Sequence, residues 1–194
     1  MKTEYKASRA LWMWLLGLVV GVGGTYAFFR APVSVDGVDH NGDGVLDEKW
    51  TYSPVGATTI YEDDRNLDGK ADYVARYDRR GQVEHAEADD NFDGVFETRA
   101  TFLTGKVDVS EVDTDADGVA DLVWRHRHGV VQTAEYLNVA NGKPLRVEYF
   151  RLGKVQRAEL DADRDGELDA FRIYDTAGEI LSSGPLSAGP LHSR

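Results

Sequence analysis

The chain contains no cysteine, and this absence removes several classes of protein at once. A disulfide framework, a thiolate metal site and a lipid-modified N-terminal cysteine are all excluded. The 194 residues are enough for one domain together with a targeting segment.

Positive charge is also scarce. The chain has 22 Lys and Arg against 34 Asp and Glu, a net charge of −12. Residues 1–30 carry +3, so residues 31–194 carry −15. Binding to nucleic acid depends on a basic surface, so we expect no nucleic-acid partner.

Helical periodicity is missing after Arg30, where no segment repeats its apolar residues every 3.6 positions. The period is two instead. Ala71, Tyr73, Ala75 and Tyr77 alternate with more polar residues, which is typical of a half-buried strand.

One nine-residue pattern recurs along this region. Asp113 to Asp121 reads DTDADGVAD, with acids at positions 1, 3, 5 and 9 and glycine at position 6. A sixth copy, from Leu137 to Leu145, has lost every acid. The six units repeat every 24–25 residues, which indicates a tandem array. The acidic copies begin at Asp39, Asp64, Asp89, Asp113 and Asp161.

Acids at alternate positions, a backbone carbonyl at position 7 and a glycine turn can wrap oxygen ligands around a hard cation. Ligands that are all oxygen favour calcium over zinc or copper, and magnesium gives up its waters reluctantly. We therefore predict about five calcium sites, one per acidic loop, and none at the degenerate copy. The predicted ligands are Asp39, Asn41, Asp43, Val45 (carbonyl) and Asp47; Asp64, Asn66, Asp68, Lys70 (carbonyl) and Asp72; Asp89, Asn91, Asp93, Val95 (carbonyl) and Glu97; Asp113, Asp115, Asp117, Val119 (carbonyl) and Asp121; and Asp161, Asp163, Asp165, Glu167 (carbonyl) and Asp169.

Charge gives these ions a structural role, because the ligand sets hold 17 carboxylates whose mutual repulsion opposes folding. Metal binding would then be coupled to folding. The alternative is that Asp, Asn and Gly form hydrogen-bonded turns without a metal. Glutamates two residues before the loops are either outer ligands or cross-strand partners: Glu62, Glu87, Glu111, Glu135 and Glu159.

Each unit reads as a metal loop, a strand, a glycine turn and a returning strand. Turns such as Arg79-Arg80-Gly81 suit a short hairpin with glycine in a left-handed conformation. We predict an all-β fold in which residues 33–181 form six tandem β-hairpin repeats with about twelve antiparallel strands. An elongated, twisted array is favoured over a barrel, because the apolar face is thin and interrupted. The periodicity leaves an open array and a hairpin solenoid as alternatives.

The N-terminal region reads differently. Residues 10–29 are a 20-residue run without charge, long enough to span a bilayer. Basic residues precede it, which predicts a cytoplasmic segment at 1–9 and an exported repeat domain in the periplasm or outside the cell. A cleaved signal peptide is the alternative to a single-pass anchor. Residues 182–194 are rich in Gly, Ser and Pro and are expected to be disordered.

The Asp-x-Asp/Asn-x-Asp-Gly loops resemble the calcium loops of EF-hands, dockerins and thrombospondin type 3 repeats. An EF-hand also needs an acid at position 12 and flanking helices, and this chain has neither. The whole unit resembles repeat proteins of bacterial envelopes over residues 36–181. That resemblance implies export and calcium binding but no defined activity.

These observations predict a membrane-anchored, exported, calcium-binding repeat protein with a structural or adhesive role and an unknown protein or glycan partner. A calcium-dependent sensor or an accessory subunit of an envelope complex is the alternative. We expect no enzymatic activity, since the five histidines are scattered and the acids are committed to the loops.

Overall fold

Thirteen β-strands and one short helical segment make up the part of the chain that this computed structural model describes, residues 17–25 and 34–186. The strands are β1 (Ser34–Val38), β2 (Glu48–Tyr52), β3 (Thr58–Asp63), β4 (Tyr73–Tyr77), β5 (Val83–Ala88), β6 (Thr98–Leu103), β7 (Lys106–Val112), β8 (Leu122–Arg127), β9 (Val130–Leu137), β10 (Pro144–Arg151), β11 (Lys154–Leu160), β12 (Ala170–Tyr174) and β13 (Ile180–Pro185).

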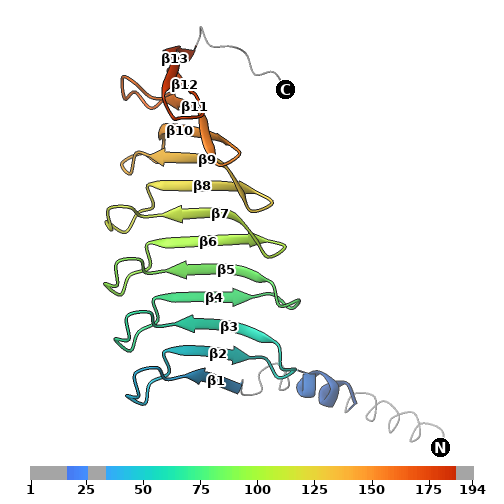
Figure 1. The fold of residues 1–194 in the computed structure, drawn as a ribbon. Coiled ribbons are helices and arrows are strands. Elements are labelled where there is room, and N and C mark those ends of the chain that lie inside the picture. The colour runs from blue at the N-terminus through green and yellow to red at the C-terminus, as the bar shows by residue number, and fades with distance from the viewer. Residues whose placement is uncertain (1–16, 26–33, 187–194) are drawn as a thin grey trace, which may run out of the picture.

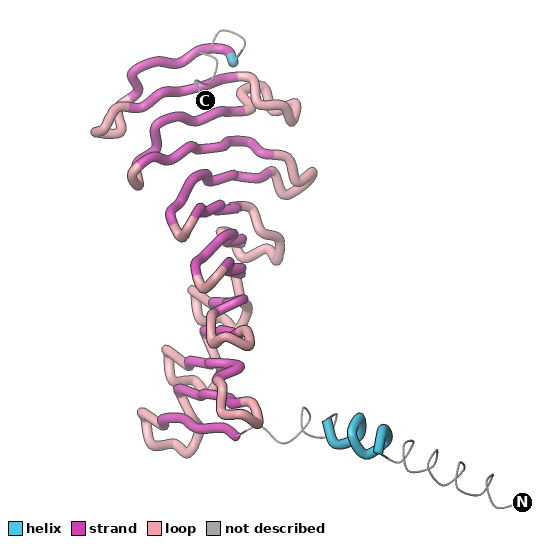
Figure 2. Tube along the Cα trace, turned by 90° about the vertical axis from the view of Figure 1, so that its right-hand side faces the viewer, coloured by secondary structure: helices cyan, strands magenta, loops and turns pink. Residues whose placement is uncertain are grey.

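All thirteen strands form one sheet, and their order in the sheet is their order in the sequence. Each strand pairs antiparallel with the strand before it and the strand after it, as in the β2–β3 and β3–β4 pairs. The strands β1 and β13 lie at opposite ends, so the sheet is open. It forms a long ladder that twists along its length (Figures 1 and 2). The all-β character predicted from the two-residue alternation is present.

The predicted membrane helix is wrong. Residues 17–25 are helical, and at about 1.5 Å per residue they extend roughly 14 Å, less than half of a bilayer's hydrocarbon core. No helix in the described residues is both long and apolar enough to cross a membrane. This finding corrects the membrane anchor predicted at 10–29 and the single-pass localisation that depended on it. Residues 10–16 and 26–29 of that span, and the segment 1–9, lie outside the described residues.

The predicted strand number is also wrong, because counting began at the first loop. That loop needs a partner strand on each side, and Ser34–Val38 pairs with β2 to provide it. At the other end β13 continues to Pro185, beyond the repeat boundary expected at 181. Residues 187–194 of the expected disordered tail lie outside the described residues.

A single-layer sheet has no second layer to cover its apolar face, so large side chains cover small ones within the layer. Ala134 on β9 is fully buried, and its cross-strand neighbour is Trp124 on β8. The rings of Trp124 and Phe150 lie 5.7 Å apart although β9 runs between their strands. The two rings therefore meet across β9 and shield its alanine. Ala75 and Ala158, at 1% and 0% exposure, lie in the same central row.

The opposite face carries ion pairs between neighbouring strands. Four of the five glutamates that precede the loops pair with a Lys or Arg, three of them across to a neighbouring strand and Glu159 with Arg157 on its own strand β11, so these four are ion-pair partners rather than outer metal ligands. Tyr149 also donates a hydrogen bond to Glu159, at 3.0 Å. The pairs are Lys49–Glu62 (2.8 Å), Arg99–Glu87 (3.5 Å), Arg125–Glu135 (2.7 Å) and Arg157–Glu159 (2.9 Å).

Two-residue turns join three of the hairpins. In each turn both residues have a positive φ: 53° and 71° at Thr104-Gly105, 55° and 80° at His128-Gly129, and 53° and 75° at Leu152-Gly153. This is the type I′ conformation, whose twist matches that of the flanking strands. Glycine adopts it freely, whereas a branched apolar residue such as Leu152 is strained there.

Replacing Leu152 with Asn is expected to raise the free energy of unfolding by about 0.5–1 kcal/mol, because Asn tolerates the left-handed conformation better than Leu. The side chain of Leu152 is 92% exposed, so the substitution removes almost no packing. Urea denaturation followed by circular dichroism measures the change. Leu103→Asn is the control, since Leu103 is exposed beside the Thr104-Gly105 turn but does not itself have a positive φ. Equal stabilisation by both variants would contradict the strain at Leu152.

Candidate metal centres

Six loops lie along one long edge of the sheet, on the left in Figure 1, and each joins an odd-numbered strand to the next even-numbered one. Five are the acidic segments. The remaining loop, at 137–145, is the degenerate copy and lies between the acidic loops at 113–121 and 161–169. Backbone hydrogen bonds join consecutive loops: Asp64 donates its N–H to the carbonyl of Asp47 at 2.7 Å, and Asp89 donates to Asp72 at 2.8 Å. The loops are therefore stacked in fixed register.

The aspartate at position 1 organises each loop by accepting a hydrogen bond from the N–H of the glycine at position 6. In the fourth loop Gly118 donates to Asp113 Oδ2 at 2.7 Å, and Asp113 is only 6% exposed. Gly118 has a φ of 93°, a conformation that side chains rarely adopt. The other four loops repeat this contact at 2.6–2.9 Å, through Asp39–Gly44, Asp64–Gly69, Asp89–Gly94 and Asp161–Gly166.

Positions 3 and 5 point into the same loop interior. The carboxylate at position 5 accepts from the N–H at position 7, as Asp117 does from Val119 at 2.9 Å. Three loops bring three carboxylates together, with ligand atoms within 4.8 Å of one another. These clusters could hold a metal ion. They are Asp89, Asp93 and Glu97; Asp113, Asp115 and Asp117; and Asp161, Asp163 and Asp165. In the first three loops Asn41, Asn66 and Asn91 occupy position 3, so an amide replaces the middle carboxylate.

The carbonyl at position 7 accepts no hydrogen bond from any described residue in the five acidic loops. These are the predicted carbonyl ligands Val45, Lys70, Val95, Val119 and Glu167. In the degenerate copy the equivalent carbonyl, that of Lys143, accepts from Asn138 N–H at 2.8 Å. The acidic loops thus keep an oxygen available that the degenerate loop uses internally.

Position 9 has a role that the sequence analysis missed. Its carboxylate accepts a hydrogen bond from the N–H at position 2, as Asp72 does from Arg65 at 2.8 Å and Asp169 does from Ala162 at 2.8 Å. Each therefore closes its loop where the next strand begins. Only Glu97, which has one more methylene than aspartate, belongs to a carboxylate cluster in the described residues. Asp47, Asp72, Asp121 and Asp169 belong to none of these clusters.

In the fourth loop, at 113–121, desolvation and the closely spaced carboxylates change the pKa of Asp115. Partial desolvation raises the pKa of Asp115, and the charges of Asp117, Asp121 and Asp113 raise it further. In the first loop the N–H groups of Gly44 and Gly42 lower the pKa of Asp39. Carboxylates at loop positions 1 and 3 are thus in different electrostatic environments, and a cation would relieve the repulsion around Asp115.

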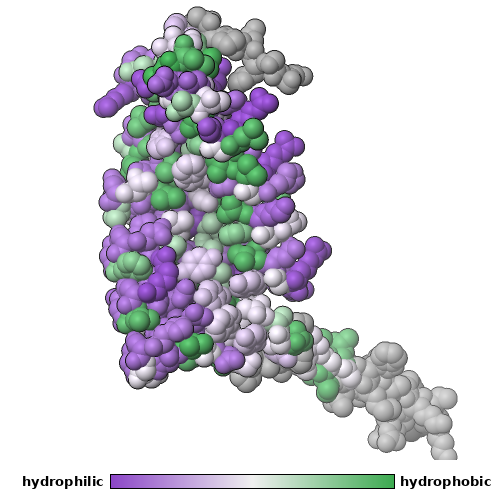
Figure 3. Space-filling model, viewed as in Figure 1, coloured by the Kyte–Doolittle hydropathy of each residue, from purple (hydrophilic) through white to green (hydrophobic). Residues whose placement is uncertain are grey.

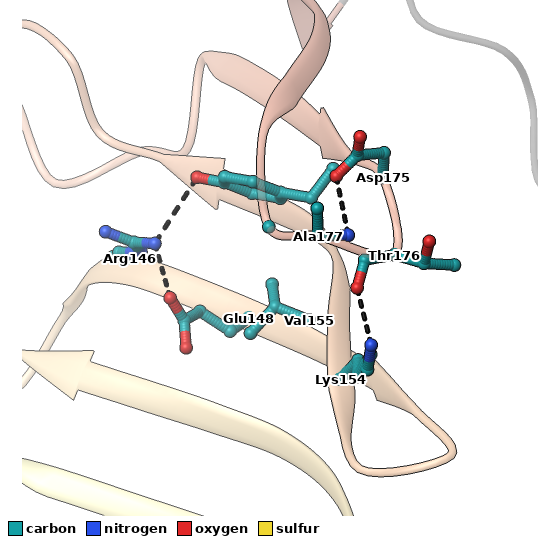
Figure 4. A pocket seen from close by; sticks show the side chains of 9 residues that line it. Arg146, Glu148, Lys154, Val155, Asp175, Thr176 and Ala177 are labelled. Carbon is teal, nitrogen blue, oxygen red and sulfur yellow. Dashed lines mark hydrogen bonds and ion pairs between the residues drawn. The ribbon is translucent and has the colours of Figure 1, made fainter.

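A separate polar hollow of about 360 Å³ lies near the C-terminal end, between β10, β11 and the β12–β13 turn (Figure 4). Glu148, which is 7% exposed, forms an ion pair with Arg146 on its floor. Arg146 also donates to the Tyr174 hydroxyl at 3.4 Å, and Lys154 Nζ donates to the Thr176 carbonyl at 2.5 Å. The charged groups that line the hollow are thus bonded to one another or to the backbone.

No protein-family model matches the chain. No curated protein matches it either.

Several solved structures are similar to part of the chain. A GtfA/B complex bound to UDP and GlcNAc is 16% identical with a TM-score of 0.42, covering 63% of this chain and 26% of that one. The Gap123 glycosylation-associated complex from Streptococcus agalactiae is 15% identical (TM-score 0.31, 66% and 22%). The accessory secretory protein 1, 2 and 3 complex in Streptococcus pneumoniae is 13% identical (TM-score 0.27, 69% and 20%). This chain spans about a quarter or less of each of these chains, and similarity at this level carries nothing about function.

Proposed function

We propose that the five acidic loops bind calcium and that the protein is a calcium-stabilised repeat scaffold for a protein or glycan partner. The observation that carries this proposal is the contrast at position 7. Within the described residues, the position-7 carbonyls of the five acidic loops accept no hydrogen bond, whereas the carbonyl of Lys143 is hydrogen-bonded in the one loop without acids. The position-9 acids account for the difference, because they accept the position-2 N–H that Asn138 donates to the Lys143 carbonyl in the degenerate loop, where Leu145 cannot accept it. The acidic loops thereby keep the position-7 carbonyl available to a cation.

The donor set favours calcium over other ions. Each loop offers two or three carboxylates at positions 1, 3 and 5, an Asn amide in some loops, and a backbone carbonyl. Calcium takes roughly 6–8 oxygen ligands in flexible geometry, and water can complete such a set. Magnesium demands a tighter octahedron and keeps its waters. The resemblance of the loops to EF-hand, dockerin and thrombospondin type 3 calcium loops supports the same ion.

A structural role fits these loops better than a sensor or a catalytic role. A sensor needs two conformations that calcium can select between. Here each loop is bonded to the next through its backbone, as Asp64 is to Asp47, and its carboxylates are bonded to its own N–H groups. Those contacts favour one fixed arrangement, and they leave few acids free for acid–base chemistry.

Calcium titration of the full chain by isothermal calorimetry tests the proposal. We expect about five calcium ions per chain, one per acidic loop. Asp117→Ala is expected to remove about one of them, because it deletes a position-5 carboxylate. Asn141→Ala is the matched control at position 5 of the degenerate loop, and it is expected to change nothing. A stoichiometry of about six, or of two or fewer, contradicts the proposal, as does equal binding of magnesium.

A further inference from the structure

The edge opposite the metal loops is built from the hairpin turns, on the right in Figure 1. The first three turns between β4 and β9 touch in sequence. A methyl group at Gly129 would lie 3.6 Å from Cβ of Lys106, and one at Gly105 would lie 3.5 Å from Cβ of Gln82. The β10–β11 turn follows them along the same edge (Figure 1), and these four turns, together with the residues that flank them, are here named the turn edge.

The turn edge is cationic in a protein of net charge −12. Its six exposed cations are Arg79, Arg80, Lys106, Arg127, Arg151 and Lys154. Within the described residues the first five make no ion pair or hydrogen bond through their side chains. Asp78 is the one acid in these four turns, and it accepts from the N–H groups of Arg80 and Gln82. Four cations on the ion-paired face, by contrast, have glutamate partners: Lys49, Arg99, Arg125 and Arg157.

The two long edges are electrostatically separate. The six loops hold 19 carboxylates against four Lys or Arg side chains. Strands of 5–8 residues place roughly 17–26 Å between the edges, two to three times the Debye length of about 8 Å at physiological salt. An anionic partner at the turn edge is thus screened from the acids of the loops.

Apolar side chains lie among these cations. Leu103, Val130 and Leu152 flank or form the turns and are 65%, 53% and 92% exposed. In Figure 3 hydrophilic side chains project from this edge, with hydrophobic ones beside them. A partner that carries only charge would leave these apolar groups in water. A partner with both acids and apolar residues would match both.

The twist of the turn edge favours a flexible partner over a rigid one. Each turn recurs after two strands, roughly 9.6 Å, and the sheet twists between them (Figure 2). A rigid flat surface, or a second rigid copy of this chain, would touch only a few turns before the edge curves away. An extended chain can follow the curve.

From these observations we propose that the turn edge is a docking surface for a flexible, acidic polypeptide segment that carries apolar residues. The cations of successive turns would pair with its carboxylates, while Leu103 and Leu152 would contact its apolar side chains. The proposed docking surface contains none of the metal loops. A test of the surface is therefore independent of whether the loops bind calcium.

The test uses the full chain at fixed saturating calcium and a fluorescent, unstructured peptide of mixed Glu and Leu residues. Fluorescence anisotropy should detect binding that weakens at least about tenfold between 50 and 200 mM salt. Arg127→Glu/Arg151→Glu should weaken it at least about tenfold, whereas Arg76→Glu/Arg172→Glu, exposed cations on the sheet faces, should weaken it less than about twofold. Leu103→Ser/Leu152→Ser should weaken binding while leaving its salt dependence unchanged.

Other outcomes would overturn the proposal. Equal loss in both charge-reversal pairs would mean that only net charge matters. Equal binding of polyglutamate would make the partner a plain polyanion, and tighter binding of anionic lipid vesicles would make it a membrane surface. Salt-sensitive self-association without peptide would make it a second copy. Circular dichroism melts confirm that each variant is folded.

Discussion

Removing calcium with EGTA is expected to lower the melting temperature by more than about 20 °C. Each site filled at roughly 100 times its Kd contributes about 2.7 kcal/mol, and five such sites act together. For a chain of this size ~1 kcal/mol shifts the melting temperature by about 2–4 °C. The physical reason is the stack of loops: without cations, acidic clusters such as Asp113, Asp115 and Asp117 repel one another at the edge that joins the strands.

Circular dichroism of the full chain, melted in calcium, in EGTA and in EGTA with restored calcium, measures this effect. Calcium should restore the original melting temperature, and magnesium at equal concentration should not. Melting temperatures that agree within about 2 °C in all conditions would mean that the loops are hydrogen-bonded turns and that their charge serves only solubility.

Trp124→Ala is expected to lower the free energy of unfolding by about 3 kcal/mol, even though the indole is only half-buried. Tryptophan truncation costs about 3–5 kcal/mol in a closed core, and partial exposure reduces this cost. Trp124 also meets Phe150 across β9 and shields Ala134, so its removal opens the central row of the sheet on three strands. The corresponding fall in melting temperature is roughly 6–12 °C.

Urea denaturation followed by far-ultraviolet circular dichroism measures this loss without depending on tryptophan fluorescence. Leu103→Ala is the control, because Leu103 is 65% exposed at the turn edge, and it is expected to cost less than about 0.5 kcal/mol. A similar, small cost for both variants would show that the apolar face is not stabilised by rings that bridge strands.

Much of the sheet could be predicted because its determinants are local. Alternation around Ala75 indicated strands, and glycines such as Gly105 marked the turns in advance. The first strand was missed because a repeat counted from its loop assigns no partner to Ser34–Val38. The membrane helix was predicted from apolar length alone. Of the nine helical residues described, four are glycine, a poor helix former.

The metal loops were harder to predict from the sequence, since aspartate has two different roles in them. Aspartate at position 1 and aspartate at position 9 look identical in the sequence, yet Asp72 accepts from a backbone N–H where the next strand begins, and Asp113 lies in a carboxylate cluster. Whether a position-9 carboxylate joins a cluster depends on the length of its side chain. Glu97, with one more methylene than aspartate, joins one. The carbonyls at position 7 could be predicted only from their place in the loop pattern, because any residue supplies a carbonyl.

The sequential strand order also has a consequence for how the molecule is made. Each strand pairs with the strands just before and just after it in the chain, so no pairing in the described sheet waits for a distant strand. Proteins rich in such local contacts close short loops and fold quickly. A growing chain leaving the ribosome could therefore add one finished hairpin at a time, each on the template of the last. If synthesis stopped early, the strands already made would form a shorter sheet in which they are already paired.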